Sequence, residues 1–77
     1  MVNYTPKVLL SIAGSDNSAG AGIQADIKTC ISLKAYCLCC LTTVTSQNSK
    51  KVHKLIKLPN EFLESQIKTV INEYPID

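Results

Sequence analysis

The residues best suited to bind a ligand lie in two polar stretches, each directly after an apolar run. Gly14–Gly20 (GSDNSAG) follows the first run, and Thr45–Asn48 (TSQN) follows the second. If both runs are parallel strands, both stretches lie at carboxyl ends, where ligands of open α/β sheets bind. Glycines let the backbone approach a ligand closely, and the start of a following helix offers N–H groups to an anion or polar group. The two stretches are therefore expected to meet at one edge of a sheet.

Asp26 and Gln47 are the side chains in this region with the clearest capacity for specific hydrogen bonds. Asp26 falls beside the apolar positions of a predicted helix, and a carboxylate facing a sheet needs hydrogen bonds or a ligand. The alternative is a structural Asp26 that caps a loop N–H at the edge of the apolar stripe. Gln47 follows the second predicted strand, and its planar amide matches the edge of an aminopyrimidine or of adenine. Its alternative is a role in loop structure.

Two nucleotide-binding patterns can be compared with the glycine-rich stretch. Gly20–Ala25 (GAGIQA) matches G-x-G-x-x-A, which is typical of dinucleotide sites. However, six residues separate Ala13 from Gly20, and no acidic residue ends the second predicted strand to bind a ribose. The Walker A pattern is absent because no Gly-Lys-Ser/Thr occurs. The sequence therefore argues against a Rossmann or P-loop site.

Four cysteines in 77 residues invite a metal or redox interpretation, and their placement argues against one. Cys37 and Cys40 form a C-x-x-C, but in a strand their thiols point to opposite faces, which suits neither zinc nor a dithiol. The sequence has no second C-x-x-C, and His53 is its only histidine. We interpret Cys30, Cys37, Cys39 and Cys40 as small apolar residues.

The apolar pattern predicts an α/β arrangement in the order βαββα. The predicted elements are a strand over Lys7–Ala13, a helix from Ala21 to near Lys34, a strand over Tyr36–Thr45, a short half-exposed strand over Val52–Leu58, and a helix that Asn60 caps and Pro75 ends. The first helix should bury Ile23, Ile27, Cys30 and Ile31, with Gln24, Lys28 and Ser32 on its other side. The second should bury Phe62, Leu63, Gln66, Ile67, Val70, Ile71 and Tyr74. The first two strands are expected to be parallel.

Length and composition exclude several classes of function. The 77 residues allow one domain at most. The net charge is only +2 and there is no arginine, the residue that makes most specific contacts to guanine, so we expect no nucleic-acid partner. No apolar run approaches the ~20 residues of a membrane span, and no signal peptide is evident, so we expect a cytoplasmic protein with reduced thiols.

Two consecutive segments carry a family resemblance. Ile12–Asp16 (IAGSD) and Ser18–Thr29 (SAGAGIQADIKT) closely resemble the amino-terminal motif of hydroxymethylpyrimidine/phosphomethylpyrimidine kinases, enzymes of thiamine synthesis. The resemblance continues through Leu41–Asn48 and Pro59–Tyr74, so it covers essentially the whole chain. Because the family's chains are much longer, it implies an incomplete amino-terminal βαββα portion of a ribokinase-like parallel-sheet sandwich, with residues 1–77 as a single partial domain.

The resemblance also implies a site and a reaction. Gly14, Asp26 and Gln47 occupy positions that line the family's pyrimidine pocket. ATP and Mg²⁺ are the implied cofactors, but their site and the catalytic residues belong to the family's carboxyl-terminal part, so we expect the chain to be inactive alone. The family also implies a homo-oligomer, which we do not expect of a shortened chain. The alternative function is a non-catalytic module that binds a small ligand or a partner.

The chain departs from the family pattern at three positions. Ala19 stands where the family usually has glycine, which should stiffen the loop slightly. Lys34 and Cys37 stand where a Gly-x-x-Gly pattern is frequent. These two differences bear on the turn into the second strand rather than on the pocket.

Overall fold

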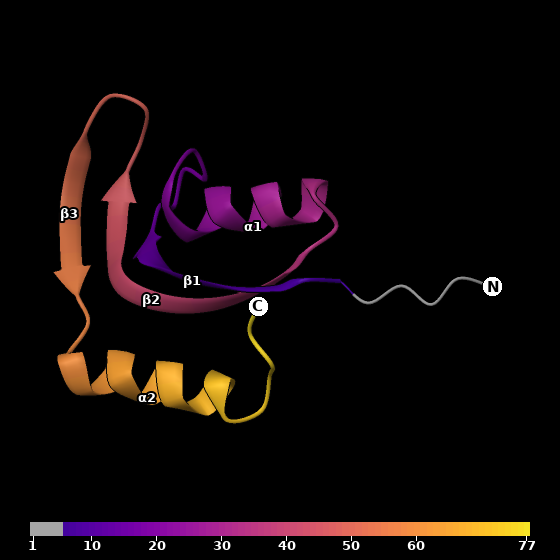
Figure 1. Cartoon of the computed structure of the whole chain (residues 1–77). Coiled ribbons are helices and arrows are strands. Elements are labelled where there is room, and N and C mark those ends of the chain that lie inside the picture. The colour runs from indigo at the N-terminus through magenta and orange to yellow at the C-terminus, as the bar shows by residue number, and fades with distance from the viewer. Residues whose placement is uncertain (1–5) are drawn as a thin grey trace.

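The fold is a three-stranded sheet with one helix on each of its faces (Figure 1). The structure, a computed structural model, describes residues 6–77. Its elements are β1 (Val8–Ser15), α1 (Gly22–Ser32), β2 (Tyr36–Gln47), β3 (Val52–Lys57) and α2 (Asn60–Ile71). The predicted βαββα order is therefore confirmed.

The central strand of the sheet is β2. It pairs in parallel with β1, from Val8 opposite Tyr36 to Ala13 opposite Leu41. It pairs in antiparallel fashion with β3, because the short turn after Gln47 returns the chain directly beside β2. The sheet is thus mixed, and its parallel half is the pair that the sequence predicts.

Side chains alternate between the two faces of the parallel pair, and each face meets a different helix. Ser11, which lies opposite Cys39, hydrogen bonds to Asp26 of α1. Tyr36 belongs to the other set, and its ring stacks on that of Tyr74, just beyond α2, with ring centroids 6.1 Å apart. Cys37 and Cys40 therefore point to opposite faces, as predicted. The fully buried apolar side chains are few: Ile23, Cys30, Leu38 and Cys40.

Both strands of the parallel pair run further than the sequence predicts. Gly14 and Ser15, predicted as loop, stay in β1 beyond an irregularity in the pairing, where Ser15 lies opposite Val44. Gln47 ends β2 rather than following it, because it pairs with Val52 across the turn. The prediction was wrong at these positions because pairing with a neighbouring strand overrides the local preference of Gly and Ser for turns.

Several predicted buried positions are exposed. All six residues of β3 are exposed, although alternation predicted one buried face, because no helix among the described residues packs against this strand. Ile31 of α1 is 69% exposed. In α2, Phe62 and Ile71 are also exposed. Asn60 is the first helical residue and makes no capping hydrogen bond, so its prediction as the N-cap was wrong; Pro59 precedes the helix.

The outer edge of β1 meets the last residue of the chain. The Asp77 N–H donates to the Val8 carbonyl oxygen over 2.9 Å, and the Val8 N–H donates to the Asp77 carboxylate over 2.8 Å. Further along this edge strand, Leu9 and Ile12 are 41% and 49% exposed. Asp77 therefore pairs with only the beginning of the outer edge of β1, and apolar side chains of this strand stay partly exposed.

Candidate functional site

Asp16 organises the loop between β1 and α1. It is the one buried polar residue in the described part of the chain, at 5% exposure. Its Oδ1 accepts hydrogen bonds from the Ser18 N–H (2.8 Å) and Ser18 hydroxyl (2.6 Å). Its Oδ2 accepts one from the Ala21 N–H (2.9 Å). The carboxylate thus holds both ends of the loop. It also occupies the Ala21 N–H just before α1, one of the N–H groups that were predicted to be available for a ligand.

The charged form of Asp16 is favoured by this environment. The Ser18 hydroxyl and backbone N–H hold the pKa of Asp16 below its ordinary value of 3.8, with a smaller contribution from the Ala21 N–H. Burial acts in the opposite direction but does not outweigh these bonds. Asp16 is therefore an ionised structural anchor at neutral pH.

Gln24 joins the first turns of α1 to the end of β1. Its Oε1 accepts from the Asp16 N–H over 2.8 Å, and its Nε2 donates to the Ser15 hydroxyl over 2.7 Å. The sequence places Gln24 on the polar side of the helix, away from the core. In the structure it is half-buried and faces the strand end, because these two polar groups need partners.

Two glycines permit a close approach of backbone at the end of β1. A Cβ on Gly14 would collide with the Thr43 hydroxyl oxygen of β2. Gly22 has φ +63°, and a Cβ there would collide with the Gly14 carbonyl oxygen. The first contact lets β1 and β2 approach closely, and the second fixes where α1 begins relative to β1.

Two of the three departures from glycine, Ala19 and Lys34, keep a glycine-like backbone. Ala19 has φ +67° and Lys34 has φ +58°, both in the left-handed region. Lys34 follows the last turn of α1, where glycine is the usual residue. The loop and the turn into β2 thus keep this conformation at some cost in strain.

A relay of hydrogen bonds sets the orientation of Gln47. The Thr45 hydroxyl donates its proton to the Ser15 carbonyl oxygen over 2.8 Å. The same Thr45 oxygen accepts from Gln47 Nε2 over 2.7 Å, which requires the amide nitrogen to face Thr45. The Gln47 backbone N–H donates to Asn17 Oδ1, which ties the end of β2 to the glycine-rich loop. The two polar stretches therefore meet, as the sequence predicts.

Asp26 lies further back along β1. Its Oδ2 accepts from the Ser11 hydroxyl over 2.6 Å, and the side chain is exposed. The structural alternative, in which Asp26 caps a loop N–H, is wrong in its choice of partner, because Asp26 bonds to a strand side chain. Asp26 borders a hollow of about 400 Å³ between β1 and α1, which Ser11, Ile12 and Cys37 also line.

The three predicted site residues thus fall into two groups. Gly14 and Gln47 lie at the carboxyl ends of β1 and β2, and Asp26 faces the middle of β1. Asp16, Asn17 and Ser11 were not predicted from the sequence as residues that build the site. The Asp-x-Ser spacing at Asp16 is a usable signal, because such side chains bond to the N–H two residues on.

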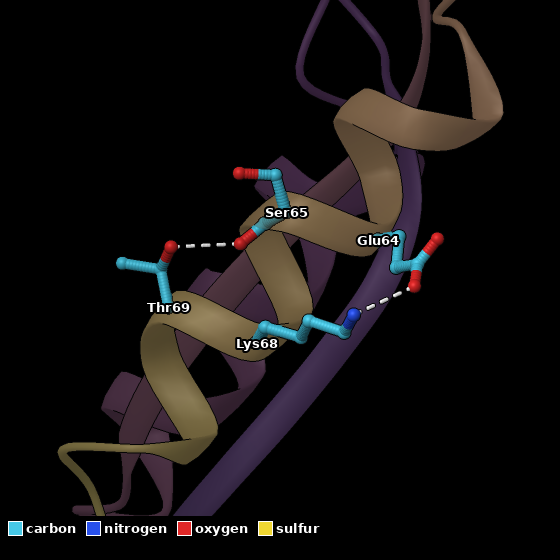
Figure 2. A network of polar contacts seen from close by, with 4 residues as sticks. All are labelled: Glu64, Ser65, Lys68 and Thr69. Atoms are coloured by element: carbon cyan, nitrogen blue, oxygen red, sulfur yellow. Dashed lines mark hydrogen bonds and ion pairs between the residues drawn. The ribbon is translucent and has the colours of Figure 1, made fainter.

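A second hollow, of about 380 Å³, runs along the outer side of α2 and offers less chemistry. Figure 2 shows its central residues, an exposed Lys68–Glu64 ion pair of 2.8 Å and the Thr69 hydroxyl bonded to the Ser65 carbonyl oxygen. These are local contacts of one exposed helix and contribute little to stability. In residues 6–77, no cluster of three acidic, His or Cys side chains suits a metal ion. No helix in that range is long and apolar enough to cross a membrane.

Comparison with known proteins identifies the family. The family model described as phosphomethylpyrimidine kinase matches residues 16–77. The chain belongs to this family. It is 45% identical over 76 residues to the chloroplastic thiamine biosynthetic bifunctional enzyme TH1 of Arabidopsis thaliana. That match covers 99% of the chain and 14% of the plant enzyme.

Solved structures confirm the fold as the amino-terminal part of a ribokinase-like kinase. Phosphomethylpyrimidine kinase from Clostridium difficile 630 superposes with a TM-score of 0.86 at 40% identity, over 90% of this chain and 32% of that one. Pyridoxal kinase from Staphylococcus aureus, in complex with AMP-PCP and pyridoxal, gives 0.80 at 38% identity, over 92% and 27%. The chain therefore spans at most about a third of these relatives.

Proposed function

We propose that the chain forms the pyrimidine-binding portion of a hydroxymethylpyrimidine/phosphomethylpyrimidine kinase. The complete kinase transfers a phosphoryl group from ATP to hydroxymethylpyrimidine or its phosphate in thiamine synthesis. Family membership supports the reaction class. The observation that carries the assignment to this part of the chain is the fixed orientation of the Gln47 amide at the strand ends.

The Gln47 amide offers the pattern that an aminopyrimidine edge requires. One N–H is committed to Thr45, and we take it to be the N–H trans to the carbonyl oxygen, which leaves the second N–H and the oxygen side by side. Among residues 6–77, no donor bonds to that oxygen, so it can accept from an exocyclic amino group while the N–H donates to the adjacent ring nitrogen. A planar amide makes this pair of bonds to adenine for the same reason.

Gly14 and Asp26 complete the proposed pocket wall. We place Gly14 beside the ring through its backbone at the strand end, because the Thr43 hydroxyl of β2 fills the space that a Gly14 side chain would take. One oxygen of Asp26 is held by Ser11, which leaves the other to accept from a substrate hydroxyl. The ionised Asp16 keeps the connecting loop in place without touching substrate.

ATP and Mg²⁺ are assigned to parts of the kinase outside this chain. The AMP-PCP complex of the related pyridoxal kinase supports ATP as the phosphoryl donor. Bound ATP and Mg²⁺ would supply the phosphoryl group and stabilise its charge. This chain's own residues bind and orient the acceptor.

The proposal extends to partner and compartment. The substrate is a small pyrimidine, with neither nucleic acid nor membrane as partner. The four free cysteines favour a reducing compartment such as the cytoplasm, although the plant relative is chloroplastic. We propose that the chain is inactive alone because phosphoryl transfer depends on stabilising charge as well as on positioning the acceptor.

A chimeric enzyme tests the assignment. Residues 6–77 replace the equivalent segment of the C. difficile kinase, and ATP-dependent phosphorylation of hydroxymethylpyrimidine is measured. We expect an active chimera in which Gln47→Ala lowers kcat/KM roughly 5- to 100-fold, the value of two hydrogen bonds of about 0.5–1.5 kcal/mol each. The matched control is Ser49→Ala, on an exposed residue of the adjacent turn.

Two results would contradict the proposal. If circular dichroism shows that the chimera is folded but it phosphorylates no pyrimidine, the proposed kinase reaction is contradicted. Equal effects of Gln47→Ala and Ser49→Ala in an active chimera would place the pocket elsewhere. In the unmodified chain, hydroxymethylpyrimidine binding by calorimetry should be millimolar or weaker, because two or three such bonds do not offset an association cost of about 4 kcal/mol or more.

A further inference from the structure

Folding brings together two cysteines that the sequence separates. Cys30 lies in the last turns of α1, and Cys37 lies at the start of β2, on the face that α1 covers. The backbone between them turns tightly, since the Ala35 N–H donates to the Cys30 carbonyl oxygen over 2.8 Å. The turn thus places the helix end directly over the beginning of the strand.

The two thiols interact with each other. The side chains of Cys30 and Cys37 are close enough to influence each other's pKa, and the Cys39 thiol influences that of Cys37 as well. Burial is the largest influence on both thiols and raises the pKa of each. Burial keeps both thiols protonated at neutral pH, and we assign Cys37 as the attacking thiol because it is the more exposed of the two.

Both thiols also face a space that a small reagent can enter. Cys30 and Cys37 line the hollow of about 400 Å³ between α1 and β1. Cys30 is only 6% exposed, whereas Cys37 is partly exposed. Cys40, by contrast, is fully buried on the opposite face of the sheet. Cys39 interacts with Cys37 as well, but it does not line the hollow, so access favours the Cys30–Cys37 pair among the four free cysteines.

We propose that Cys30 and Cys37 form a thiol pair that a small hydroperoxide converts to a disulfide. The Cys37 thiol releases its proton and its sulfur attacks one oxygen of hydrogen peroxide; an S–O bond forms, the O–O bond breaks, and the leaving hydroxide takes up the released proton to become water. The Cys30 sulfur then attacks the Cys37 sulfenic acid; the S–S bond forms and a second water leaves. Two thiols are oxidised by two electrons, and one peroxide is reduced to two waters.

The disulfide would act beside the proposed pyrimidine site. The Asp26 carboxylate borders the same hollow, and its charge acts on both thiols. A disulfide between Cys30 and Cys37 ties the end of α1 to β2. It also removes two thiol groups from the lining of the hollow that Asp26 borders. Oxidation thereby changes the surroundings of a residue that faces the substrate.

Peptide mapping of the peroxide-treated chain tests the pairing. The reduced chain is treated with hydrogen peroxide, free thiols are blocked, and the disulfide peptides are identified by mass spectrometry. We expect a loss of two hydrogens and a Cys30–Cys37 link as the dominant product. The same treatment in concentrated urea should scatter the links among all four cysteines, because the folded contact is then lost.

Matched variants separate this pair from the other thiols. Cys39→Ser and Cys40→Ser should retain the link, whereas Cys30→Ser and Cys37→Ser should abolish it. The disulfide peptides of the wild-type chain test the pairing even if a variant folds poorly. The proposal is overturned if the folded and urea-treated chains give the same distribution of links, if Cys37 pairs with Cys39 instead, or if Cys37 stops at the sulfenic or sulfinic acid with Cys30 still reduced.

Discussion

Replacing Gly14 by alanine separates a packing role from a ligand role. The added Cβ would collide with the Thr43 hydroxyl oxygen, while the Thr43 Cβ and carbonyl oxygen would each lie at 3.7 Å, an ordinary contact. The collision is therefore confined to one side-chain atom. Removing that atom with Thr43→Ala should make room for the new methyl group.

The magnitude follows from the kind of contact. Overpacking a well-filled site costs about 1–3 kcal/mol, and rotation of the Thr43 side chain should keep the value near the lower end. In a domain of this size, each kcal/mol shifts Tm by about 4–8 °C. In the Thr43→Ala background, Gly14→Ala should be neutral or stabilise by up to about 1 kcal/mol, because alanine restricts the unfolded chain.

A double-mutant cycle measures this coupling. The free energies of unfolding of the wild type, both single variants and the double variant are determined by urea denaturation. A coupling of about 1–2 kcal/mol is expected. If Gly14→Ala is equally destabilising with and without the Thr43 hydroxyl, the contact is not its cause, and the backbone conformation at Gly14 must be considered instead.

Four further predictions concern the same loop and the helix that covers the opposite face. Ala19→Gly should stabilise the fold by about 1 kcal/mol, because φ +67° strains an L-residue; the urea midpoint should rise, and an unchanged midpoint would argue against strain. Gly22→Ala should cost more than 2 kcal/mol by the same measurement, since it adds positive-φ strain to a backbone collision. Because the pKa of Asp16 is lowered on folding, its carboxylate stabilises the fold above about pH 4, and this stabilisation is lost as the pH falls through the lowered pKa. In Asp16→Asn, the free energy of unfolding should therefore fall less steeply as the pH drops below about 4. An unchanged pH dependence would contradict the hydrogen bonds described for Asp16. Gln66→Leu should speed hydrogen exchange of the Leu41 amide roughly tenfold or more, because the Gln66 side chain bonds to both backbone groups of Leu41; exchange that stays slow would show that other contacts protect that amide.

The sequence by itself determined the order of the elements and the parallel pairing of β1 and β2. It also determined that Cys37 and Cys40 point to opposite faces. The parallel pairing follows from the helix that connects the two strands. The element order and the two faces follow from the spacing of residues within one helix or strand, where the period of 3.6 or 2 is fixed by local backbone geometry. The family motif around Gly14 and Asp26 was readable for the same reason, since its residues are close together in the chain.

The tertiary structure alone decided which polar groups meet. The Gln47 amide takes its orientation from Ser15, 32 positions earlier, through the Thr45 hydroxyl. Neither this relay nor the thiol contact between Cys30 and Cys37 can be deduced from spacing, because each depends on how separate elements pack. Exposure along β3 was missed for a related reason. Alternation predicts that a strand has an apolar face, but only the presence of a neighbouring element decides whether that face is buried.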